Sequence, residues 1–550
     1  GEDDNKEATR KKLEDGLDSL VPGHKEALAV VCRLYDIDLG VNIDKERFLL
    51  KLANVVRDIL NAASQQAPVV ICLQDLHWAD ASTMLLTREL LSNPGGAVVF
   101  IVNFRPGLTF DEDNIHVINL DVLSNDQSRE LLESLLGGPA PALLYEFIQD
   151  RAEGNPFFTE EIVQSMIETG ALAREGETWK LVDQNKLADI PATVQGVLAA
   201  RIGRLADDRR RLLREAAVIG REFLYELVKQ ISQIECDVNS ELEGLAALDL
   251  IREKSKSEFL EYMFKHALVQ EVAYEGLLKK ERQQLHKKVG QAIETLLKHR
   301  AGDMVETLAY HYQLAGDVDK AVFYSIAAGK RAFDHNAITE AENIYEAAYD
   351  LLMETERTEA QNRLLVELVV QWCSCLIDDM KIVKAAQLLD KHWDTAEQLN
   401  DPELMVLYRS QRGFPYFGNI EFEKSLSLGN QTITMARTIK NREAEAKALA
   451  INPFPLISLG RLPEALESAR LAVSIVEKTD DPGYFHHYAL CLAQLWYGSW
   501  NELDEEILWM EAQVESGFAR FESYAKLFRS WESYFFIDME SALELSKSAL

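Results

Sequence analysis

The stretch Val69-Val-Ile-Cys-Leu-Gln-Asp-Leu-His-Trp-Ala-Asp80 decides the fold of the first part of this chain. Its first five residues are apolar and mostly β-branched, which is typical of a strand buried on both faces of a parallel sheet. Asp75 follows that strand at its carboxyl end, where open α/β sheets bind their ligands. A carboxylate there can bind magnesium or orient a water molecule against a phosphate. The pattern also fits a strand followed by a solvated loop, and the residues alone leave both interpretations open.

Two further strands are predicted downstream, at residues 97–102 and 116–120, and a helix at residues 82–91 lies between the first two strands. Alternation of strand, helix and strand indicates an α/β layer with right-handed crossovers. Upstream, residues 1–66 are expected to be helical. We therefore assign residues 1–122 to part of an α/β domain.

The alternation ends near residue 122, and the fold class expected for the whole chain is mainly α. Residues 123–185 are assigned to a helical bundle, in which Gly154-Asn155-Pro156 forces a turn between two helices. Residues 186–298 combine helical patterns, one of them from residue 223 to residue 231, with a short β-hairpin that ends at Phe264. Helices followed by a hairpin are typical of a winged helix.

The last part of the chain, residues 299–550, contains a repeat of roughly 40 residues. In each repeat a turn residue is followed five positions later by a small or apolar residue. The pairs are Gly316/Ala321, Asn336/Ala341, Met380/Ala385, Gly418/Glu423, Gly460/Ala465, Gly498/Leu503 and Ile537/Ala542. Glu423 departs from this rule and leaves the register of its repeat open. The repeat predicts an α-solenoid of TPR-like helix hairpins, and such arrays usually bind a protein partner or another ligand.

Composition narrows the class of function. The 550 residues are 47% hydrophobic and 27% charged, as in ordinary globular proteins. The formal charge of −32 disfavours non-specific binding to nucleic acid or to anionic membranes. No run approaches the ~18 to 20 apolar residues of a membrane helix. The six cysteines follow neither a disulfide nor a metal-binding pattern, so we expect a cytoplasmic protein.

Five segments in one order resemble the AAA-type ATPase module of STAND signalling proteins, in which a winged helix and TPR-like repeats follow the ATPase. The segments are the stretch around Asp75, Asn103-Phe104-Arg105-Pro106, Glu153-Gly-Asn-Pro-Phe-Phe158, Ala216-Ala-Val-Ile-Gly-Arg-Glu-Phe223 and Phe264-Lys-His-Ala-Leu-Val-Gln-Glu-Val-Ala-Tyr274. Such modules occur joined to nucleotide cyclases, serine/threonine kinases and large LuxR-type transcription regulators.

The resemblance implies that residues 1–122 are the C-terminal part of a nucleotide-binding domain. It also implies roles for particular residues. Asp75 would be the Walker B carboxylate, catalytic and a ligand of magnesium, and Arg105 would be the sensor that reads the phosphate end of the nucleotide. Gly154, Asn155 and Pro156 would form the turn near the adenine. His266 would lie against the diphosphate of ADP, although a plain packing role for this histidine stays open.

Two departures from the family pattern bear on catalysis. Gln74 stands where the family usually carries a second carboxylate, so weakened ATP hydrolysis is expected. The chain also lacks the phosphate-binding motif G-x-x-x-x-G-K-[S/T], and the nearest approach, Gly329-Lys330, lies in a predicted solenoid helix. We therefore expect ATP or ADP and magnesium to bind in a longer parent protein, and little or no nucleotide to bind to this chain alone.

The residues and the resemblance support three hypotheses. The first is a nucleotide-controlled switch that couples the repeats, as a sensor, to an attached effector domain, with an oligomer formed on activation. The second is a non-catalytic interaction scaffold with a degenerate ATPase remnant. The third is the central part of a nucleotide cyclase, a kinase or a transcription regulator. The basic runs Arg209-Arg-Arg211, Lys279-Lys280 and Lys287-Lys288 are interpreted as solvated helix faces, and nucleic acid is not expected as a partner.

Overall fold

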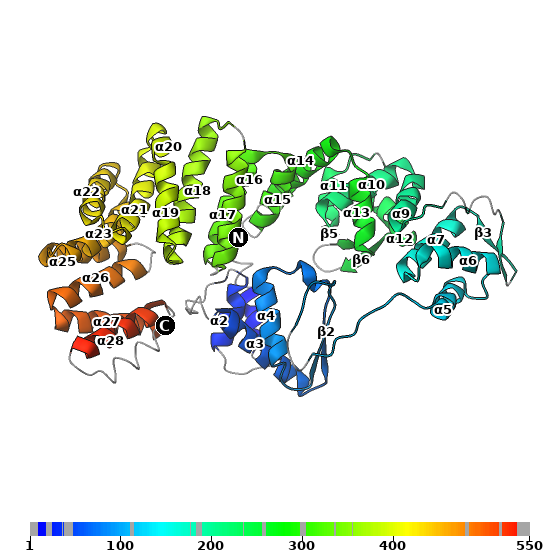
Figure 1. The fold of residues 1–550 in the computed structure, drawn as a ribbon, viewed down its shortest axis with the longest axis horizontal. Coiled ribbons are helices and arrows are strands. Elements are labelled where there is room, and N and C mark those ends of the chain that lie inside the picture. The colour runs from blue at the N-terminus through cyan, green and yellow to red at the C-terminus, as the bar shows by residue number, and fades with distance from the viewer. Residues whose placement is uncertain are drawn as a thin grey trace. The chain divides into compact units, whose positions relative to one another are not determined.

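The protein is mainly α-helical, as predicted, with three small sheets among the described residues (Figure 1). The structure, a computed structural model, describes residues 9–17, 25–35, 37, 48–110, 115–176, 178–182, 187, 190–234, 236–255, 260–296, 304–334, 337–354, 356–478, 483–515 and 520–535. The chain divides into two compact units. One comprises Gly1–Ile115 and Val322–Leu550, and the other comprises His116–Ala321.

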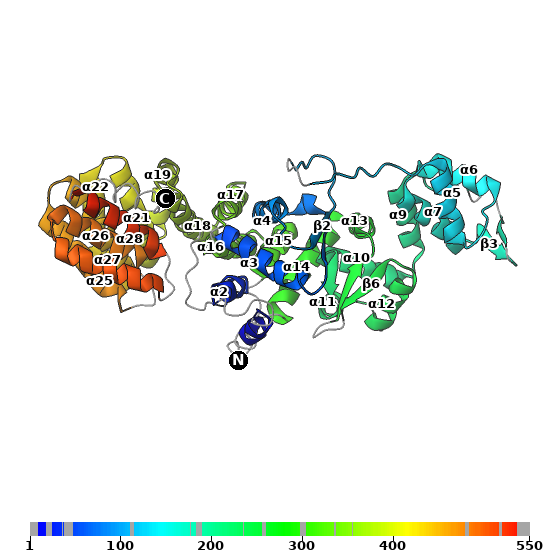
Figure 2. The ribbon, with the colours of Figure 1, turned by 90° about the horizontal axis from the view of Figure 1, so that it is seen from below.

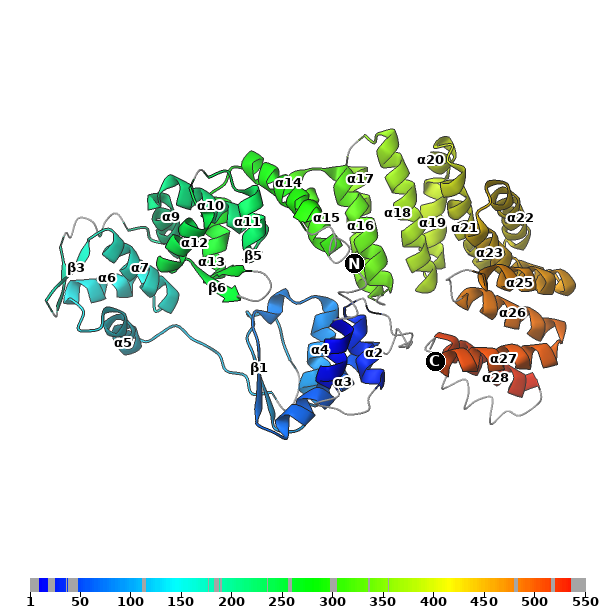
Figure 3. The same ribbon diagram turned by 180° about the vertical axis from the view of Figure 1, so that it is seen from behind.

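A two-stranded parallel sheet lies near the start of the chain, with helices beside it (Figure 3). The elements are α2 (Lys25–Arg33), α3 (Phe48–Ser64), β1 (Val69–Leu73), the 3₁₀ helix η1 (Leu76–Trp78), α4 (Ala81–Ser92) and β2 (Val98–Val102). Helix α3 contacts both strands, and apolar side chains such as Val30, Phe48 and Leu52 pack between α2 and α3. The first two strands and the helix between them therefore lie where the sequence predicted them.

Two expectations for this sheet are wrong. The strands are not buried on both faces, since Val70, Val99 and Ile101 are 58%, 56% and 55% exposed. Side chains alternate between the two faces of a strand, and α3 covers only the other face. Residues 116–120 are extended but form no strand. An apolar run becomes a strand only where a neighbouring strand can bond its backbone N–H and C=O groups.

The second unit begins with three helices and an antiparallel hairpin. These are α5 (Asn125–Leu136), α6 (Ala142–Ala152), α7 (Pro156–Glu168), β3 (Leu172–Glu175) and β4 (Thr178–Leu181). Buried side chains such as Leu132, Leu144 and Ile162 hold the three helices together. The helices lie where they were predicted, whereas the hairpin was not predicted.

Helices and a three-stranded antiparallel sheet follow. They are α9 (Val194–Arg204), α10 (Asp207–Ile219), β5 (Glu222–Leu224), α11 (Tyr225–Ile231), α12 (Val238–Ala247), β6 (Ile251–Ser255), β7 (Glu261–Phe264), α13 (Ala267–Glu275) and α14 (Lys279–Leu296). The strand order is β5-β7-β6. The predicted hairpin is present as β6 and β7. Residues 222–224 form a third strand in place of the first turn of a predicted helix, because Phe223 packs on the hairpin residues Tyr262 and Phe264.

The described residues from 304 onward form helices only, and neighbouring helices such as α21 and α22 or α25 and α26 pack together as an α-solenoid (Figure 2). The helices are α15 (Val305–Ala315), α16 (Val318–Asp334), α17 (Ile338–Met353), α18 (Glu359–Asp378), α19 (Ile382–Lys391), α20 (Trp393–Gln398), α21 (Pro402–Gly418), α22 (Phe422–Ile439), α23 (Arg442–Ile451), α24 (Pro453–Ser458), α25 (Leu462–Val476), α26 (Tyr484–Tyr497), α27 (Trp500–Glu515) and α28 (Arg520–Phe535). Across the described part of the chain, no helix has both the length and the apolar character needed to cross a membrane.

The turns within the helix hairpins repeat one hydrogen-bond pattern. Each turn residue has a left-handed backbone, and the residue after it donates its N–H to a carbonyl in the last turn of the preceding helix, as Lys381 does to Leu376 at 2.8 Å. These turn residues are Gly316, Met380, Ile420, Gly460 and Gly498. The residue five positions later is buried in every case, and these residues are Ala321, Ala385, Ser425, Ala465 and Leu503.

This pattern corrects the register of one repeat. The pair is Ile420/Ser425, not Gly418/Glu423, because the left-handed residue that makes the turn is an isoleucine. Ser425 restores the rule of a small buried residue, and its hydroxyl donates to the carbonyl of Gly413 at 2.8 Å. Asn336 and the pair Ile537/Ala542 lie outside the described residues.

Candidate functional site

Backbone hydrogen bonds hold Asp75 beside the residue that follows β2, at the carboxyl edge of the parallel sheet. The N–H of Asp75 donates to Asn103 Oδ1 at 2.6 Å, and the N–H of Leu76 donates to the carbonyl of Asn103 at 3.0 Å. Asn103 in turn donates its N–H to the carbonyl of Leu73 at 3.0 Å. Asp75 has a φ of 57°, which is uncommon outside glycine and turns the chain sharply into η1. Asp75 therefore has a defined place at the edge that the sequence predicted.

Arg105 lies at the same edge. Its guanidinium carbon is 5.8 Å from the ring centroid of Trp78, within the range of a cation–π contact. Trp78 belongs to η1, which starts directly after Asp75. The structure therefore brings Asp75 and Arg105 into one neighbourhood. Asp80 has the other role considered for it, since its carboxylate accepts the N–H of Thr83 at 2.7 Å and caps α4.

Asp75 could contribute one ligand to a magnesium ion. The described residues contain no group of three or more histidine, cysteine, aspartate or glutamate side chains that could hold a metal ion. Magnesium is often bound by one or two carboxylates, with phosphate oxygens and waters as its other ligands. Asp75 thus fits a magnesium ion that arrives with a nucleotide better than a metal site built by protein alone. Gln74 beside it is exposed and carries no charge.

Gly154, Asn155 and Pro156 form the turn between α6 and α7. Each of the three residues suits the backbone conformation or the hydrogen bonds at its position. Gly154 has a φ of 76°, and a Cβ atom there would lie 2.4 Å from the carbonyl oxygen of Leu123. Asn155 Oδ1 accepts the N–H of Phe158 at 3.1 Å and caps α7. Pro156 occupies the first turn of that helix, where a missing N–H removes no helical hydrogen bond.

His266 contacts the helix that begins at this turn. The ring centroids of His266 and Phe157, the second residue of α7, are 4.3 Å apart. Burial, helped by the positive charge of Lys265, lowers the pKa of His266, and Glu160 and Asp249 oppose this shift. The imidazole is therefore neutral at pH 7, with one N–H donor and one acceptor nitrogen. Two of the predicted segments thus meet in the fold, although residues 157 and 266 are far apart in the sequence.

A buried ion cluster lies on the same face of α7 as Phe157. Arg201 of α9 is 5% exposed and donates to Glu161 at 2.5 Å and to Glu168 at 2.6 Å. Burial raises the pKa of Glu161, while the Arg201 guanidinium opposes that rise. Removing one partner of such a buried cluster leaves an uncompensated charge, so the cluster holds α7 and its Phe157 in place against α9.

The candidate residues fall into two sets. Asp75 and Arg105 belong to the unit that contains the parallel sheet, and Gly154, Asn155, Pro156 and His266 belong to the other unit. Sequence reasoning missed two contacts that organise these sets, those of Asn103 and Phe157. Both residues lie inside segments that carry the family resemblance, but their contacts join distant parts of the sequence and leave no local pattern.

Comparisons with known proteins give weak matches. Residues 124–178 match a family described as a domain of unknown function (DUF8739). An uncharacterized protein of Rhizobium meliloti (strain 1021) is 26% identical over 341 residues, which are 58% of this chain and 32% of that protein. The chain thus spans about a third of the length of this curated relative.

Solved structures with similarity to this chain include helical-repeat proteins. One is a Signal Transduction ATPase with Numerous Domains (STAND) protein with a tetratricopeptide repeat sensor from Pyrococcus horikoshii. It is 14% identical, with a TM-score of 0.44 over 92% of this chain and 76% of that one. Another is aspartyl phosphate phosphatase F from Bacillus subtilis, 13% identical with a TM-score of 0.38 over 78% of this chain and 95% of that one.

Proposed function

We propose that this chain is the regulatory core of a STAND-type signalling ATPase, in which an adenine nucleotide controls a switch between the repeat array and an effector. The contact between Phe157 and His266 carries this proposal. In the family that the sequence resembles, the turn before Phe157 lies near the adenine and the histidine lies near the diphosphate. Their meeting in one unit is what such a shared ligand requires.

The chemistry of His266 suits a phosphate neighbour. Its pKa is lowered because burial disfavours the charged imidazolium. A phosphate close by would favour the charged form and raise the pKa again, so nucleotide binding and protonation of His266 would be coupled. The histidine would therefore report on the state of the nucleotide.

Asp75 and Arg105 would act on the phosphates of a nucleotide. Asp75 would share in binding magnesium, which neutralises phosphate charge, and Arg105 would bond phosphate oxygens. Neither the phosphate-binding loop nor a second carboxylate at position 74 is present in the sequence. We therefore expect this chain alone to be inactive as an ATPase, and nucleotide binding to need a longer parent protein.

In this proposal the residues from 186 to 298 act as a winged-helix domain that connects the nucleotide to the repeats. The solenoid offers a protein partner its surface, because each hairpin buries one face on its neighbours and leaves the other open. The effector would be a nucleotide cyclase, a kinase or a transcription regulator, and activation would form an oligomer. These assignments rest on the resemblance.

The test measures the nucleotide content of the purified parent protein. We expect it to retain ADP, the His266→Ala variant to lose most of it, and the Asp75→Asn variant to lose magnesium-dependent hydrolysis. His116→Ala, at an exposed histidine outside both sets, is the matched control and should retain ADP. A parent protein that retains no adenine nucleotide and binds none when it is added would contradict the proposal.

The second candidate function is a non-catalytic scaffold, which the uncharged Gln74 beside Asp75 favours. Under this alternative the ATPase-like segment would only stabilise the start of the chain. The same experiment separates the two functions, since a scaffold would retain no nucleotide while still folding.

A further inference from the structure

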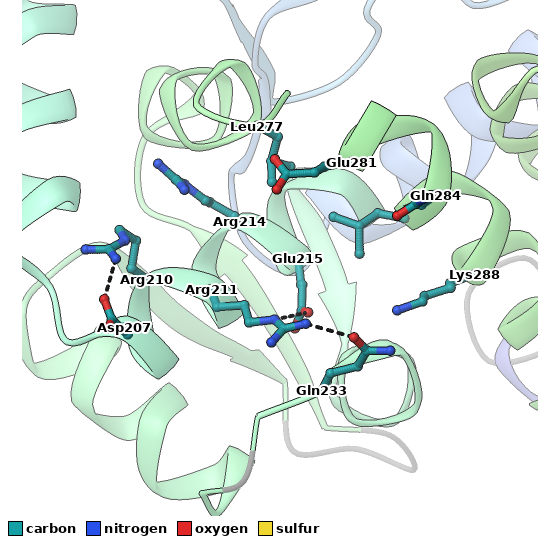
Figure 4. A pocket seen from close by; sticks show the side chains of 11 residues that line it. Asp207, Arg210, Arg211, Arg214, Glu215, Gln233, Leu277, Glu281, Gln284 and Lys288 are labelled. Atoms are coloured by element: carbon teal, nitrogen blue, oxygen red, sulfur yellow. Dashed lines mark hydrogen bonds and ion pairs between the residues drawn. The ribbon is translucent and has the colours of Figure 1, made fainter. Parts of the chain in front are cut away.

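A pocket of about 470 Å³ lies in the second unit, between α10 and α14 (Figure 4). Both helices contribute a stripe of side chains at helical spacing, and Gln233 and Leu277 complete the lining. From α10 come Asp207, Arg210, Arg211, Arg214 and Glu215, and from α14 come Glu281, Gln284, Leu285 and Lys288. Arg211 is exposed, as predicted for a solvated helix face. The other basic lining residues are half-buried, because they stand where α10 packs on α14.

Two acidic side chains of the pocket pair with arginines, although Glu215 Oε2 is buried without a hydrogen-bond partner. Asp207 is paired with Arg210. Glu215 accepts from Arg211 Nε at 3.2 Å, and the same arginine donates to Gln233 at 2.8 Å. Figure 4 shows both interactions of Arg211 near the centre of the view. Half of the basic side chains in the pocket are thus neutralised by its own carboxylates.

Two cations remain. Within the described part of the chain, neither Arg214 nor Lys288 forms a hydrogen bond or a close ion pair, and Arg214 Nε is buried without an acceptor. The charge of Lys288 acts on Glu215 at longer range. The ammonium group of Lys288 points from α14 toward Glu215 and Arg211 (Figure 4). The third carboxylate, that of Glu281, accepts the N–H of Leu278 at 2.9 Å.

The lining of the pocket differs in charge from the chain as a whole. The chain has 90 acidic and 58 basic side chains, so acidic partners are abundant. In the pocket basic residues outnumber acidic ones, since four basic and three acidic residues line it. A buried donor without an acceptor is unfavourable, and an anionic ligand would supply the acceptor that the protein does not.

We propose that this pocket binds a phosphate-bearing small molecule, with Arg214 and Lys288 as its phosphate ligands. Guanidinium and ammonium groups are the side chains that proteins use for phosphate oxygens. A volume of about 470 Å³ exceeds what one phosphate ion fills and lies in the range of small-molecule sites. Gln233 and Gln284 offer hydrogen bonds to the rest of such a ligand. None of the residues proposed for the adenine nucleotide lines this pocket.

Inorganic pyrophosphate is the probe for this site, titrated calorimetrically into the chain at low salt. We expect binding to the unmodified chain and roughly tenfold weaker binding to Lys288→Met, since one charge-assisted contact is lost. Lys280→Met is the matched control, because Lys280 is an exposed lysine on the same helix outside the pocket. It should bind pyrophosphate as the unmodified chain does.

A second variant separates this site from the proposed nucleotide site. His266→Ala should leave pyrophosphate binding unchanged, and loss of binding in that variant would overturn the proposal. Equal weakening by Lys288→Met and Lys280→Met would overturn it as well, because it would mean a general charge effect. So would a duplex oligonucleotide that binds through Lys288 when pyrophosphate does not. Circular dichroism of each variant shows whether it is folded.

Discussion

At the scale of single residues, Ile420 stands out among the turns of the solenoid. It has a φ of 65° and is 75% exposed, whereas glycine occupies the equivalent turn at Gly460 and Gly498. A left-handed conformation costs a residue with a Cβ roughly 1–2 kcal/mol. Glycine avoids this cost, but its more flexible unfolded chain lowers the free energy of unfolding by about 0.5–1 kcal/mol. We predict that Ile420→Gly raises the free energy of unfolding by about 0.5–1 kcal/mol, measured from the urea midpoint of the repeat array.

Ile420→Ala is the control for this prediction. Alanine removes the exposed side chain but keeps the Cβ atom that causes the strain, so it should change stability little. If the alanine variant gained as much as the glycine variant, the benefit would come from removing exposed apolar surface, and the conformational explanation would be wrong.

Gly154 shows a second residue-scale effect, in which conformation and contact act together. Its φ is 76°, and a Cβ atom would lie 2.4 Å from the carbonyl of Leu123. We predict that Gly154→Ala lowers the free energy of unfolding of the second unit by about 2–4 kcal/mol. Gly170 is the control for the conformational cost alone. Its φ is 65°, and a Cβ atom added there would have no atom within 4 Å. Gly170→Ala should cost only about 1–2 kcal/mol in the same urea titration, and equal costs would contradict the contact argument.

At the scale of elements, Gly329 sets the distance between α16 and α17. A Cβ atom there would lie 2.4 Å from the ring of Tyr345, which is 1% exposed and has no room to move. We predict that Gly329→Ala lowers the free energy of unfolding by about 1–3 kcal/mol, measured by urea titration. Gly203→Ala is the control, because a Cβ atom added at this helical glycine would have no atom within 4 Å. Its free energy of unfolding should rise by up to about 1 kcal/mol. A loss of stability in both variants would count against the packing explanation.

The same glycine shows what sequence reasoning can and cannot do for an element. The sequence placed Gly329-Lys330 in a solenoid helix, which is confirmed by α16. Short-range signals of this kind also gave β1 its residue bounds. The register near residue 420 was missed, because a left-handed turn is usually marked by glycine and here is made by isoleucine.

Contacts between residues far apart in the chain could not be predicted from the sequence. The exposed face of β1 and β2 depends on which helices pack against the sheet, and the contact of Phe157 with His266 depends on how α7 meets α13. Neither leaves a periodic pattern in the chain. The residues of the candidate site could be named from the resemblance, but their grouping into two sets required coordinates.

At the scale of the whole molecule, a pair of buried histidines makes stability depend on pH. His286 Nδ1 and His311 Nδ1 are 2.8 Å apart, and His286 Nε2 is 3.0 Å from the hydroxyl of Tyr274. Their contacts join α13, α14 and the first helix of the repeat array, α15. Burial lowers the pKa of His286 to about 4 and that of His311 to about 3, and Arg282 adds to the shift at His286. Tyr310 packs edge-on against both rings.

The sign of the effect follows from linkage. An unfolded histidine takes up its proton near pH 6.5, whereas these two stay neutral in the fold until the pH is near their lowered pKa values. Their contribution to stability is therefore full above about pH 6.5 and is lost as the pH falls from there toward about 4. We predict a lower unfolding midpoint at about pH 5 than at about pH 7.

A double variant assigns this loss to the pair. His286→Gln with His311→Gln removes both imidazoles, so its midpoint should fall less between about pH 7 and pH 5 than that of the unmodified chain, even if its stability at pH 7 is lower. Most carboxylates titrate below this window and leave it free for histidines. His116→Gln, at an exposed histidine, should keep the unmodified pH dependence. If the double variant kept it too, His392, whose pKa burial lowers to about 4, would be the better explanation.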